Sequence, residues 1–540
     1  MIKQNSRAIN LTKILIGCFF IVAVIMPVAT MFINMKPDDV VKIFTNEASK
    51  NATIRSLAVS ATSTVISVFL AFVVAWCMNR TGIKLKGIFN TLLILPMLIP
   101  SISHGMGLII LFGSNGKLTN AFGWEQGIYG FWGIVLGSVM YSFPVAYLMI
   151  SDILKYEDST QYEAAEVLGI PKLRRMTAIT LPYLRKPMIN VIFATFTLIV
   201  TDYGVPIMIG GKYKTLPVLM YEEVIGRLDF SKGSAFGMIL LLPAVCAFLI
   251  DIFCRRNTEN SYVSKPFEIK RNRIRDIFAH VLLFSVSFCI IYPIYSFIQL
   301  TFAKRYPIDL SFTFSNIEST IQKGALTFLV NSIIIALFVS VIGTVISFMC
   351  AYFTARMPGK YSSFLHLMSI TSLAVPGLVL GLSYVLFFKG TFIYGTLAIL
   401  ILVNIIHFFS SPYLMIYNSF GKMNKNLEAV GATLGIGKFR MIRDVFLPQT
   451  RATVIEMFSY FFVNSMMTIS AVAFLATSAT KPIALMINQF EAQALLEASA
   501  FVSLLILAVN LSMKCAVKII KSIINRKTVS EKNYADKKTV

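Results

Sequence analysis

The residue types that most often carry metal, redox or hydrolytic chemistry are few in this chain, and their spacing does not suit that chemistry. The four histidines form no HExxH pair and no other cluster of ligand spacing. No two of the seven cysteines are spaced as a CxxC pair, so neither a disulfide framework nor a zinc site is predicted. The sequence therefore predicts no metal site and no catalytic residue. The histidines are His104, His280, His366 and His407, and the cysteines are Cys18, Cys77, Cys246, Cys254, Cys289, Cys350 and Cys515.

Phosphate chemistry is also not predicted on this chain. A nucleotide-binding loop of the form GxxxxGK[ST] needs a Ser or Thr after its Gly-Lys pair, because that hydroxyl binds the magnesium ion. Every Gly-Lys pair in the sequence is followed by another residue type. The pairs are Gly116-Lys117, Gly211-Lys212, Gly359-Lys360, Gly421-Lys422 and Gly437-Lys438.

The polar residues with the most distinctive pattern form a short motif that occurs twice. In each copy a glycine precedes a closing Leu-Pro pair, with 13 residues from the glycine to the proline. The first copy contains Glu163, Ala164, Ala165, Gly169, Leu181 and Pro182, and the second contains Glu428, Ala429, Gly435, Leu447 and Pro448.

The motif predicts two short helices joined by a sharp turn. Glu163 to Leu168 are good helix formers, Gly169 suits a left-handed helix stop, and Pro171 suits the first turn of a new helix. A simple connector needs only 2–8 residues, and the chain uses far more in both places. A short helix presented to a groove of another protein is a known docking mode.

The elements around the motif are membrane helices. Hydrophobic residues make up 56% of the 540 residues, mean hydropathy is +0.72, and many apolar runs approach the ~20 residues that span a bilayer. The formal net charge is +23, but the basic residues fall mainly on one side of the predicted helices, the side that includes the N-terminus, the middle linker and the C-terminal tail. This asymmetry is the positive-inside pattern. It predicts cytoplasmic termini and a lipid bilayer as partner, and it argues against nucleic acid.

The predicted fold is an all-α membrane protein with 12 transmembrane helices in two parallel six-helix repeats. A shift of 276 residues places Ser56 on Ser332, Arg80 on Arg356, and Pro100 on Pro376. An even number of helices per repeat gives both repeats the same orientation. The expected helices lie near 14–33, 55–78, 88–112, 128–152, 188–210, 235–254, 277–302, 326–354, 364–388, 393–418, 453–477 and 498–520.

Two repeats, a linker and a tail organise the predicted chain. The first repeat covers 1–255, with a core at about 54–254 and its motif within 154–187. Residues 256–275 form a cytoplasmic linker. The second repeat covers 276–520, with a core at about 328–518 and its motif within 420–452. Residues 521–540 form a basic cytoplasmic tail.

The two motif copies resemble the EAA loop, the signature of permease subunits of binding-protein-dependent (type I) ABC importers. That signature has Glu-Ala-Ala, three residues, Gly, and Ile-x-Leu-Pro at the far end. Glu163, Ala164, Ala165, Gly169, and Ile179 to Pro182 fill every position. In the second copy Ala429 stands where the first has Glu163, and the acid is Glu428, one residue earlier.

The resemblance implies the partners and the location of the protein. Each loop would sit on a separate cytoplasmic ABC ATPase, so two ATPase copies are expected, with ATP and magnesium bound there and no cofactor on this chain. An extracytoplasmic binding protein would deliver the solute to a multi-pass permease in the cytoplasmic (inner) membrane. Because one residue turns a helix by about 100°, the offset acid predicts unequal coupling, with Glu163→Arg impairing transport more than Glu428→Arg.

The resemblance also extends to the solute. Fused twelve-helix permeases are typical of the group that imports ferric iron, thiamine or 2-aminoethylphosphonate. The stretch from Thr201 to Pro206, and that from Thr468 to Val472, look most like the aminoethylphosphonate and ferric-iron members. These two solutes are therefore the expected substrates.

A polar substrate path is predicted at the outer ends of two membrane helices. An acid inside a span costs on the order of 2.5–3.5 kcal/mol, so Asp202 is expected to face the bundle interior or a wet cavity. Its alternative role is at a helix end, packing beside Gly204 and Pro206. The other candidates for the path are Thr201, Tyr203, Ser465, Thr468 and Ser470.

Two other functional classes remain open at this point. A secondary, ion-coupled transporter also has two six-helix halves, and Asn79 to Gly82 resembles a loop of that class. However, the deep carboxylates that a proton relay needs are scarce. A membrane-embedded enzyme would need a paired acid and base or a metal cluster, and the sequence predicts neither.

Overall fold

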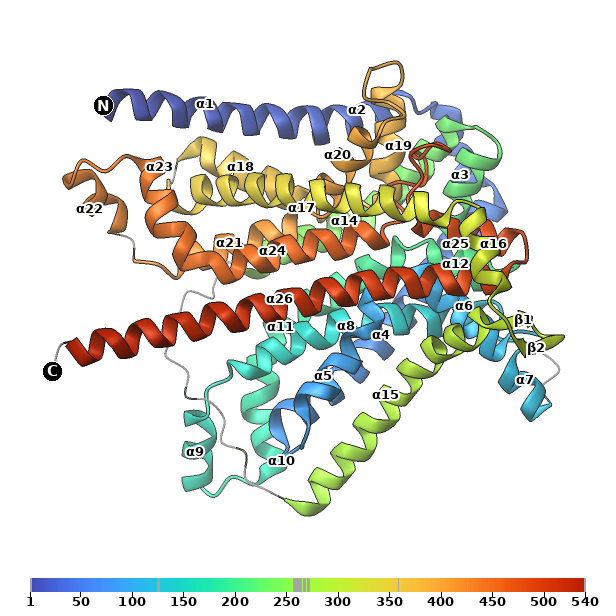
Figure 1. Cartoon of the computed structure of the whole chain (residues 1–540), viewed down its shortest axis with the longest axis horizontal. Coiled ribbons are helices and arrows are strands. Elements are labelled where there is room, and N and C mark those ends of the chain that lie inside the picture. The colour runs from blue at the N-terminus through green and yellow to red at the C-terminus, as the bar shows by residue number, and fades with distance from the viewer. Residues whose placement is uncertain are drawn as a thin grey trace. The chain divides into compact units, whose positions relative to one another are not determined.

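The computed structural model describes residues 2–123, 127–255, 265, 269, 272–357, 359–424 and 426–538. Helices dominate this part of the chain (Figure 1). One antiparallel hairpin departs from the all-α prediction, with β1 (Ala303–Arg305) paired to β2 (Asp309–Phe312) so that Ala303 faces Phe312. The hairpin directly follows a long apolar helix.

The chain forms two packing units that do not follow its order. The second-half unit contains Met1–Asn34, Gly324–Leu485 and Leu505–Val540. The first-half unit contains Met35–Lys323 and Met486–Leu504. The first helical segment of each half therefore packs in the unit formed mainly by the opposite half. Of these segments, α1 (Ile2–Phe20), η1 (Ile21–Ile25) and α2 (Met26–Ile33) start the chain, and α15 (Arg273–Thr301) starts the second half.

The first-half unit is built from long helices and short connecting ones. Its elements are α3 (Pro37–Thr45), α4 (Glu47–Arg80), α5 (Lys86–Ile94), η2 (Leu95–Leu98), α6 (Ser101–Phe112), α7 (Lys117–Phe122), α8 (Phe131–Lys155), α9 (Thr160–Val167), α10 (Lys172–Arg175), η3 (Met176–Thr180), α11 (Leu181–Val200), α12 (Gly204–Ile209), α13 (Leu216–Tyr221), η4 (Glu222–Gly226), α14 (Phe230–Arg255), α15, the hairpin and α16 (Ser315–Gln322).

The second-half unit repeats this order with differences in helix length. Its elements are α17 (Ala325–Arg356), α18 (Lys360–Thr371), α19 (Gly377–Phe388), α20 (Leu397–His407), α21 (Ser410–Gly421), α22 (Leu427–Thr433), α23 (Lys438–Met441), η5 (Ile442–Phe446) and α24 (Leu447–Met467). The last two helices, α25 (Ala484–Ala492) and α26 (Leu496–Lys538), pass through both units.

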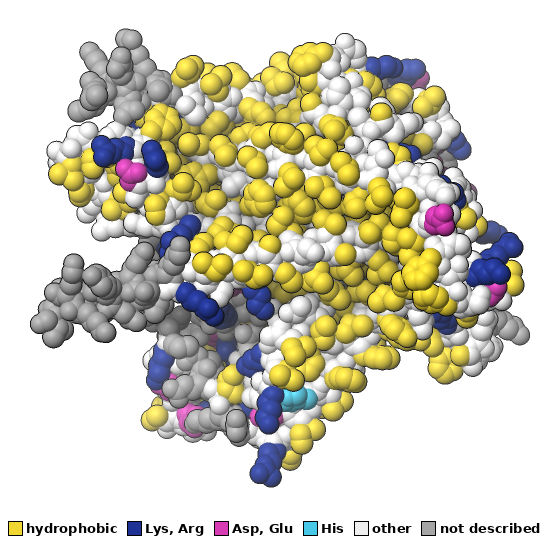
Figure 2. Space-filling model, viewed as in Figure 1, with side chains coloured by type: hydrophobic (Ala, Val, Ile, Leu, Met, Phe, Trp, Pro, Cys, Tyr) yellow, Lys and Arg dark blue, Asp and Glu magenta, His cyan; other side chains and the backbone are white. Residues whose placement is uncertain are grey.

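Seven helices in the described residues are long and apolar enough to cross a membrane, or up to nine if each of two bent helix pairs counts as one span. The protein is thus a multi-pass membrane protein, and the count of 12 stays a prediction. In Figure 2 hydrophobic side chains cover the middle stretches of the helices, whereas Lys, Arg, Asp and Glu gather near helix ends.

Several predicted helices are broken in the structure, and prolines explain two of the breaks. The expected helix 88–112 is divided into α5, η2 and α6, with a bend of 102° between its two parts. Pro96 and Pro100 lie at this break. Proline donates no backbone hydrogen bond and disfavours helical geometry in the residue before it, and Ile99, before Pro100, is extended. Pro376 separates α18 from α19 in the same way, inside the expected helix 364–388. The expected helices 393–418, 188–210 and 453–477 also break or end early, after His407, Val200 and Met467.

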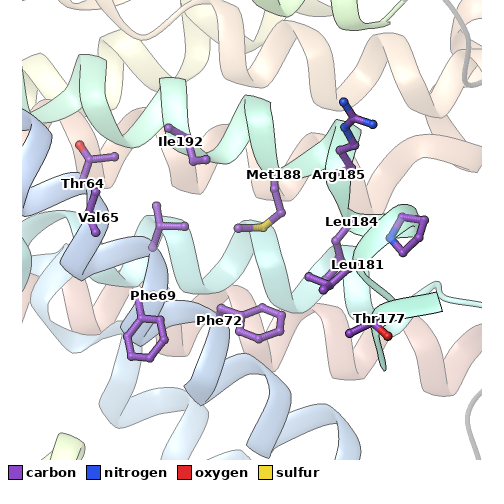
Figure 3. Close-up of a pocket in the computed structure, with 12 residues that line it drawn as sticks. Thr64, Val65, Phe69, Phe72, Thr177, Leu181, Leu184, Arg185, Met188 and Ile192 are labelled. Carbon is purple, nitrogen blue, oxygen red and sulfur yellow. The ribbon is translucent and has the colours of Figure 1, made fainter. Parts of the chain in front are cut away.

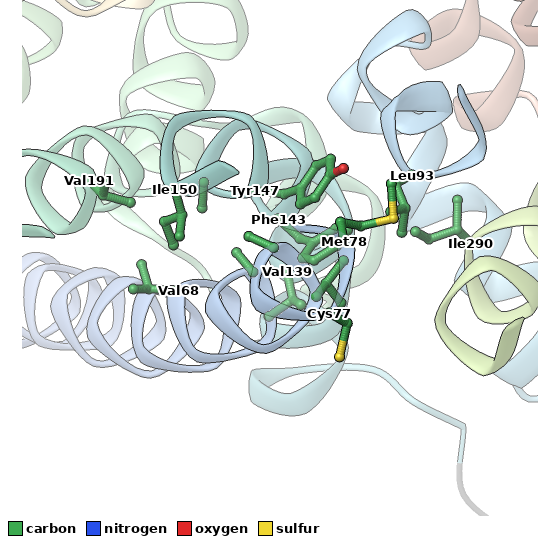
Figure 4. Close-up of a cluster of buried hydrophobic side chains, with 14 of the residues drawn as sticks. Val68, Cys77, Met78, Leu93, Val139, Phe143, Tyr147, Ile150, Val191 and Ile290 are labelled. Atoms are coloured by element: carbon green, nitrogen blue, oxygen red, sulfur yellow. The ribbon is translucent and has the colours of Figure 1, made fainter. Parts of the chain in front are cut away.

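The core of the first-half unit is a close contact between α4 and α8. Small residues of α4, among them Ser63, Ser67 and Ala71, are buried at helical spacing. The Ser67 and Ser142 hydroxyls lie 2.7 Å apart across this contact. Small side chains let membrane helices approach closely. Larger buried residues surround the contact, including Val68, Met78, Leu93, Val139, Phe143, Tyr147, Ile150, Val191 and Ile290 (Figure 4).

The helices that start each half and pack in the unit of the opposite half, here called the exchanged helices, are held by specific contacts. On the first-half unit, a Cβ atom at Gly107 of α6 would lie 2.9 Å from Pro293 and 3.3 Å from Phe297 of α15. On the second-half unit, the Tyr384 hydroxyl donates to the Ala23 carbonyl at 2.7 Å. A glycine is therefore required where α6 meets α15.

Gly107→Leu is expected to lower the apparent melting temperature of the detergent-solubilised protein. The added side chain must displace α15, and overpacking of this kind costs about 1–3 kcal/mol. The control is Gly87→Ala in α5, where a Cβ meets nothing within 4 Å. Equal melting temperatures for the Gly107→Leu protein and the unsubstituted protein would show that α15 does not pack against α6.

Candidate functional site

Each copy of the short motif forms a helix that ends in the same hydrogen-bonded turn. In the first copy, the Ile170 amide donates to the Ala165 carbonyl at 3.0 Å and the Gly169 amide donates to the Glu166 carbonyl at 3.1 Å. In the second copy, the corresponding bonds start from the Ile436 and Gly435 amides. Both glycines have φ = +67°, a conformation that glycine adopts without a side-chain clash. The left-handed stop predicted at these glycines is confirmed.

The residues after the turn do not form an isolated second helix. α10, η3 and α11 run on from Lys172 to Val200, so the predicted break at Pro182 is wrong. Pro182 is the second residue of α11, directly after the π-helical turn η3, and the helical run continues past it. The motif is therefore continuous with a membrane helix.

A buried arginine at the end of α4 holds the first motif. Arg80 forms an ion pair with Glu157, and the two side chains are only 5% and 2% exposed. Arg80 also donates to the Leu154 carbonyl at 3.0 Å. Glu157 in turn accepts a 2.6 Å hydrogen bond from the hydroxyl of Tyr162 in α9, and that hydroxyl also contacts Thr180. The motif is thus tied to the membrane helix through a single carboxylate.

The second motif is held by an arginine at the matching end of α17. Two nitrogens of Arg356 each donate to a Glu428 carboxylate oxygen at 2.6 Å. Arg356 also donates to the carbonyls of Phe420, Met423 and Asn424. Its side chain is 4% exposed. Paired donation of this kind is among the strongest side-chain interactions that arginine makes.

The two acids of the motif copies therefore point in different directions. Relative to the turn glycine, Glu428 corresponds to Tyr162, and both side chains face their buried arginine network. Glu163 is 53% exposed and faces away from Arg80. The roles predicted for both acids in ATPase coupling stay predictions. Sequence reasoning aligned Arg80 with Arg356 but missed their partners, because the Arg80–Glu157 contact joins residues far apart in the chain.

Glu163 has a partner from the predicted linker. The Lys265 ammonium lies 2.7 Å from a Glu163 oxygen. The Lys265 backbone accepts a hydrogen bond from the Ser159 amide at 3.1 Å and donates one to Asp158 at 3.2 Å. The rest of the linker, apart from residue 269 and residues 272–275, lies outside the described residues.

The charge on Glu163 is stabilised at neutral pH. The Lys265 ammonium that donates to Glu163 holds the pKa of that carboxyl below its usual value. The contact is therefore fully present above the ordinary carboxyl pKa and is lost as pH falls through the lowered pKa. Glu163 thus presents a negative charge on an exposed helix.

The remaining residues of the motif copies form the exposed surface of the loop. Ala165 is buried, whereas Ala164, Gly169, Leu181 and Pro182 are exposed. In the second copy Ala429, Gly435, Leu447 and Pro448 are exposed. Apolar side chains beside each turn are also open to solvent, with exposed fractions of 89% at Val167, 76% at Leu168, 53% at Val430 and 69% at Leu434.

The predicted substrate-path residues of the first half surround the break after α11. The Asp202 carboxylate accepts hydrogen bonds from the amides of Gly204 at 3.3 Å and Val205 at 3.0 Å, so it holds the first turn of α12. Thr201 donates back to its own helix at 2.8 Å. Tyr203 is buried and its ring is stacked on Tyr221 with centroids 5.1 Å apart. The expected position of Asp202 within a continuous helix is wrong, and its alternative helix-end role matches these contacts.

The predicted residues of the second half lie in the other packing unit. Ser465 is buried in α24, and Thr468 directly follows that helix, where its hydroxyl donates to the Asn464 carbonyl at 3.1 Å. Ser470 lies against Gly377, the first residue of α19. A metal cluster of three or more His, Cys, Asp or Glu side chains is absent among the described residues.

Glu428→Gln is expected to destabilise the protein, whereas Glu163→Gln is not. Removing the carboxylate strands the buried Arg356 charge, a loss on the order of 3 kcal/mol. Glu163 is exposed, and its removal strands no buried charge. Thermal unfolding of the detergent-solubilised protein measures both. Glu428 is thus expected to matter more for stability, whereas the alignment of the two motif copies predicted that Glu163 matters more for transport. Adding Arg356→Gln to Glu428→Gln removes the stranded charge, while the glutamine amide can still donate to nearby carbonyls, so it is expected to recover part of the loss. A double variant no more stable than Glu428→Gln would contradict the assignment of that loss to a stranded charge.

Asp202→Asn is expected to leave uptake and membrane abundance close to those of the unsubstituted protein. The asparagine side-chain oxygen still accepts hydrogen bonds at the start of α12, whereas Asp202→Ala loses them and costs about 1 kcal/mol. Uptake per membrane-inserted protein gives the comparison. Lower uptake by the Asp202→Asn protein at unchanged abundance would assign the charge to the solute path instead.

Comparison with known proteins identifies the family to which this chain is similar. The family described as "Binding-protein-dependent transport system inner membrane component" matches residues 64–257 and 343–525, one stretch in each half. The ferric transport system permease FbpB of Actinobacillus pleuropneumoniae is 24% identical over 87% of this chain and 72% of its own length. A putative ferric transport system permease, FbpB 1 of Haemophilus influenzae, is 23% identical over 87% of this chain and 77% of its own length.

A third relative matches a smaller part of the chain. The thiamine transport system permease ThiP of Haemophilus influenzae is 25% identical over 45% of this chain and 47% of its own length. The family match covers both halves, and each matched stretch contains one anchored motif. The chain therefore belongs to the family of binding-protein-dependent transport system inner membrane components, as a fused permease with two copies of the family domain.

Proposed function

We propose that this permease forms the membrane path of an ATP-driven importer for ferric iron. The relatives that match along most of both halves have ferric transport in their names. The thiamine, molybdate and sulfate relatives match less than half of the chain. Ferric iron is therefore a better-supported solute than 2-aminoethylphosphonate, the other solute expected from sequence.

The observation that carries the coupling role is the anchored motif, present once per half. A buried arginine fixes each motif helix to a membrane helix, and the turn beside it exposes apolar side chains. A rigidly held helix with exposed apolar residues suits docking into a groove of another protein. Each of α9 and α22 would bind one ATPase subunit, so two subunits are proposed. ATP and magnesium would bind to those subunits, and this chain would bind no cofactor.

The outward acid of the first motif adds a charge to its docking surface. Glu163 points to solvent, and Lys265 is its partner. A basic residue on the ATPase would then compete with Lys265 for the Glu163 carboxylate. The second motif directs its acid inward to Arg356 and would bind its ATPase mainly through apolar contacts.

The proposed topology follows from these docking surfaces. Both motifs must face the compartment that contains ATP, so both lie on the cytoplasmic side of the inner membrane. Twelve crossings with cytoplasmic termini fit this arrangement and the basic ends of the chain. An external binding protein would deliver the solute to the opposite side. The proposed path residues are Thr201, Tyr203, Ser465, Thr468 and Ser470, and Asp202 would hold the start of α12 beside them.

The family match favours ATP-driven import over the ion-coupled alternative. A direct test is uptake into proteoliposomes that contain the permease with its co-purified ATPase and a ferric-loaded binding protein. Vanadate is expected to abolish iron uptake, because it blocks the ATPase, and an uncoupler is expected to leave uptake unchanged. Uptake that persists with vanadate and collapses with the uncoupler would contradict the proposal. A binding protein without iron is the control for the solute.

A further inference from the structure

A groove of about 750 Å³ runs along the first-half unit between α4 and α11 (Figure 3). Both helices belong to segments long and apolar enough to span a membrane. The sides of the groove are almost entirely apolar. Val65, Phe69 and Phe72 line it from α4, and Leu181, Met188 and Ile192 line it from α11.

The apolar part of the groove fits within one leaflet of a bilayer. On α11 the lining residues Leu181, Arg185, Met188 and Ile192 recur every three or four positions, so they form one stripe along the helix. From Arg185 to Ile192 the helix rises by about 10 Å at 1.5 Å per residue. Half of a hydrocarbon core of ~30 Å is about 15 Å. The part of the stripe beyond Arg185 is thus short enough to lie within one leaflet.

The lining needs an apolar occupant. Val65 and Phe69 are each 69% exposed, and Leu181 and Ile192 are 48% and 42% exposed. None of the lining residues belongs to the second-half unit. Apolar side chains exposed along a membrane span are in contact with lipid chains unless protein covers them. The shape and the chemistry of the groove therefore fit an acyl chain.

The groove carries a positive charge near the end that Thr177 and Leu181 line. Arg185 is exposed and lies on the same stripe, between Leu181 and Met188. Within the described residues, no hydrogen bond or ion pair involves its side chain. In Figure 3 the guanidinium points away from the apolar side chains, and Thr177 lies at the same end. Arginine binds phosphate oxygens through two parallel hydrogen bonds, and the cytoplasmic leaflet is rich in anionic headgroups.

The second half has the same arginine in a different setting. Arg451 follows Leu447-Pro448 at the spacing of Arg185 after Leu181-Pro182, but Arg451 interacts with other groups of the chain. Arg451 is therefore a matched control for Arg185.

We propose that the groove between α4 and α11 binds one anionic phospholipid of the cytoplasmic leaflet. One acyl chain fills the apolar part, and the headgroup phosphate is bound by Arg185. The assignment of the leaflet rests on the proposed function, which places the motifs in the cytoplasm. A bound lipid at this place contacts α11 directly beyond the first motif. It would therefore stabilise the part of α11 that would receive motion from the ATPase.

The test is lipid retention by the purified permease–ATPase complex. The complex is exchanged into detergent with equal amounts of phosphatidylglycerol and phosphatidylcholine, and native mass spectrometry measures the lipid that remains bound. Arg185→Ala is expected to lower phosphatidylglycerol retention roughly tenfold, because the headgroup phosphate loses its charged hydrogen-bond donor. Arg451→Ala is expected to leave retention unchanged. Equal retention by the Arg185→Ala and Arg451→Ala complexes would overturn the proposal.

A second measurement locates the lipid and does not depend on the folding of a variant. Phosphatidylglycerol with a photoreactive group on its acyl chain is expected to cross-link to peptides of α4 and α11. Cross-links only elsewhere would overturn the site, and contacts of these peptides with the second half instead of lipid would show that protein fills the groove. Neither measurement uses ATP or iron. Failure of the lipid site is therefore distinguishable from failure of the import mechanism.

Discussion

The constraint on which the two motifs of this permease depend is the charge of a buried arginine at the end of a membrane helix. Arg80 and Arg356 are 5% and 4% exposed at the ends of α4 and α17. A guanidinium cannot lose its charge in a protein, so it must keep a carboxylate and carbonyl oxygens around it. In both halves those acceptors come from the motif and the residues just before it. The motif cannot move away from its membrane helix without leaving that charge unpaired, so a displacement of the motif is passed to the helix.

The two halves meet this constraint with different residues, and the difference decides what each motif shows to a partner. In the first half Glu157 neutralises Arg80 and Tyr162 reaches Glu157 from the motif helix, which leaves Glu163 at the surface. In the second half Glu428 is itself a residue of the motif helix and also neutralises Arg356. The difference between the surfaces of the two motifs therefore follows from where the anchoring carboxylate lies. The offset of one residue between the two acids has this structural cause.

Sequence reasoning predicted local features well because their causes are local. The turns at Gly169 and Gly435 follow from one residue type in one backbone conformation, and both have the expected left-handed geometry. The family, the membrane class and the repeat were also readable from composition and spacing. The partner of Arg80 was not, because a contact between residues 77 positions apart has no signal in a single sequence. The place of Asp202 was missed for a similar reason, since apolar composition continues through the break after Val200 and hides the end of the helix.

The exchange of first helices changes the meaning of the linker between the repeats. The sequence presents residues 256–275 as the boundary between two domains, yet α14 and α15, which flank it, pack in the same unit. The chain passes from one unit to the other after Asn34, Lys323, Leu485 and Leu504. Each first segment therefore packs with the opposite half, through contacts such as those of Gly107 with α15, and Met486–Leu504 of the second half does the same. Because these segments pack within the unit of the opposite half, the two repeats are joined by packing as well as by the linker.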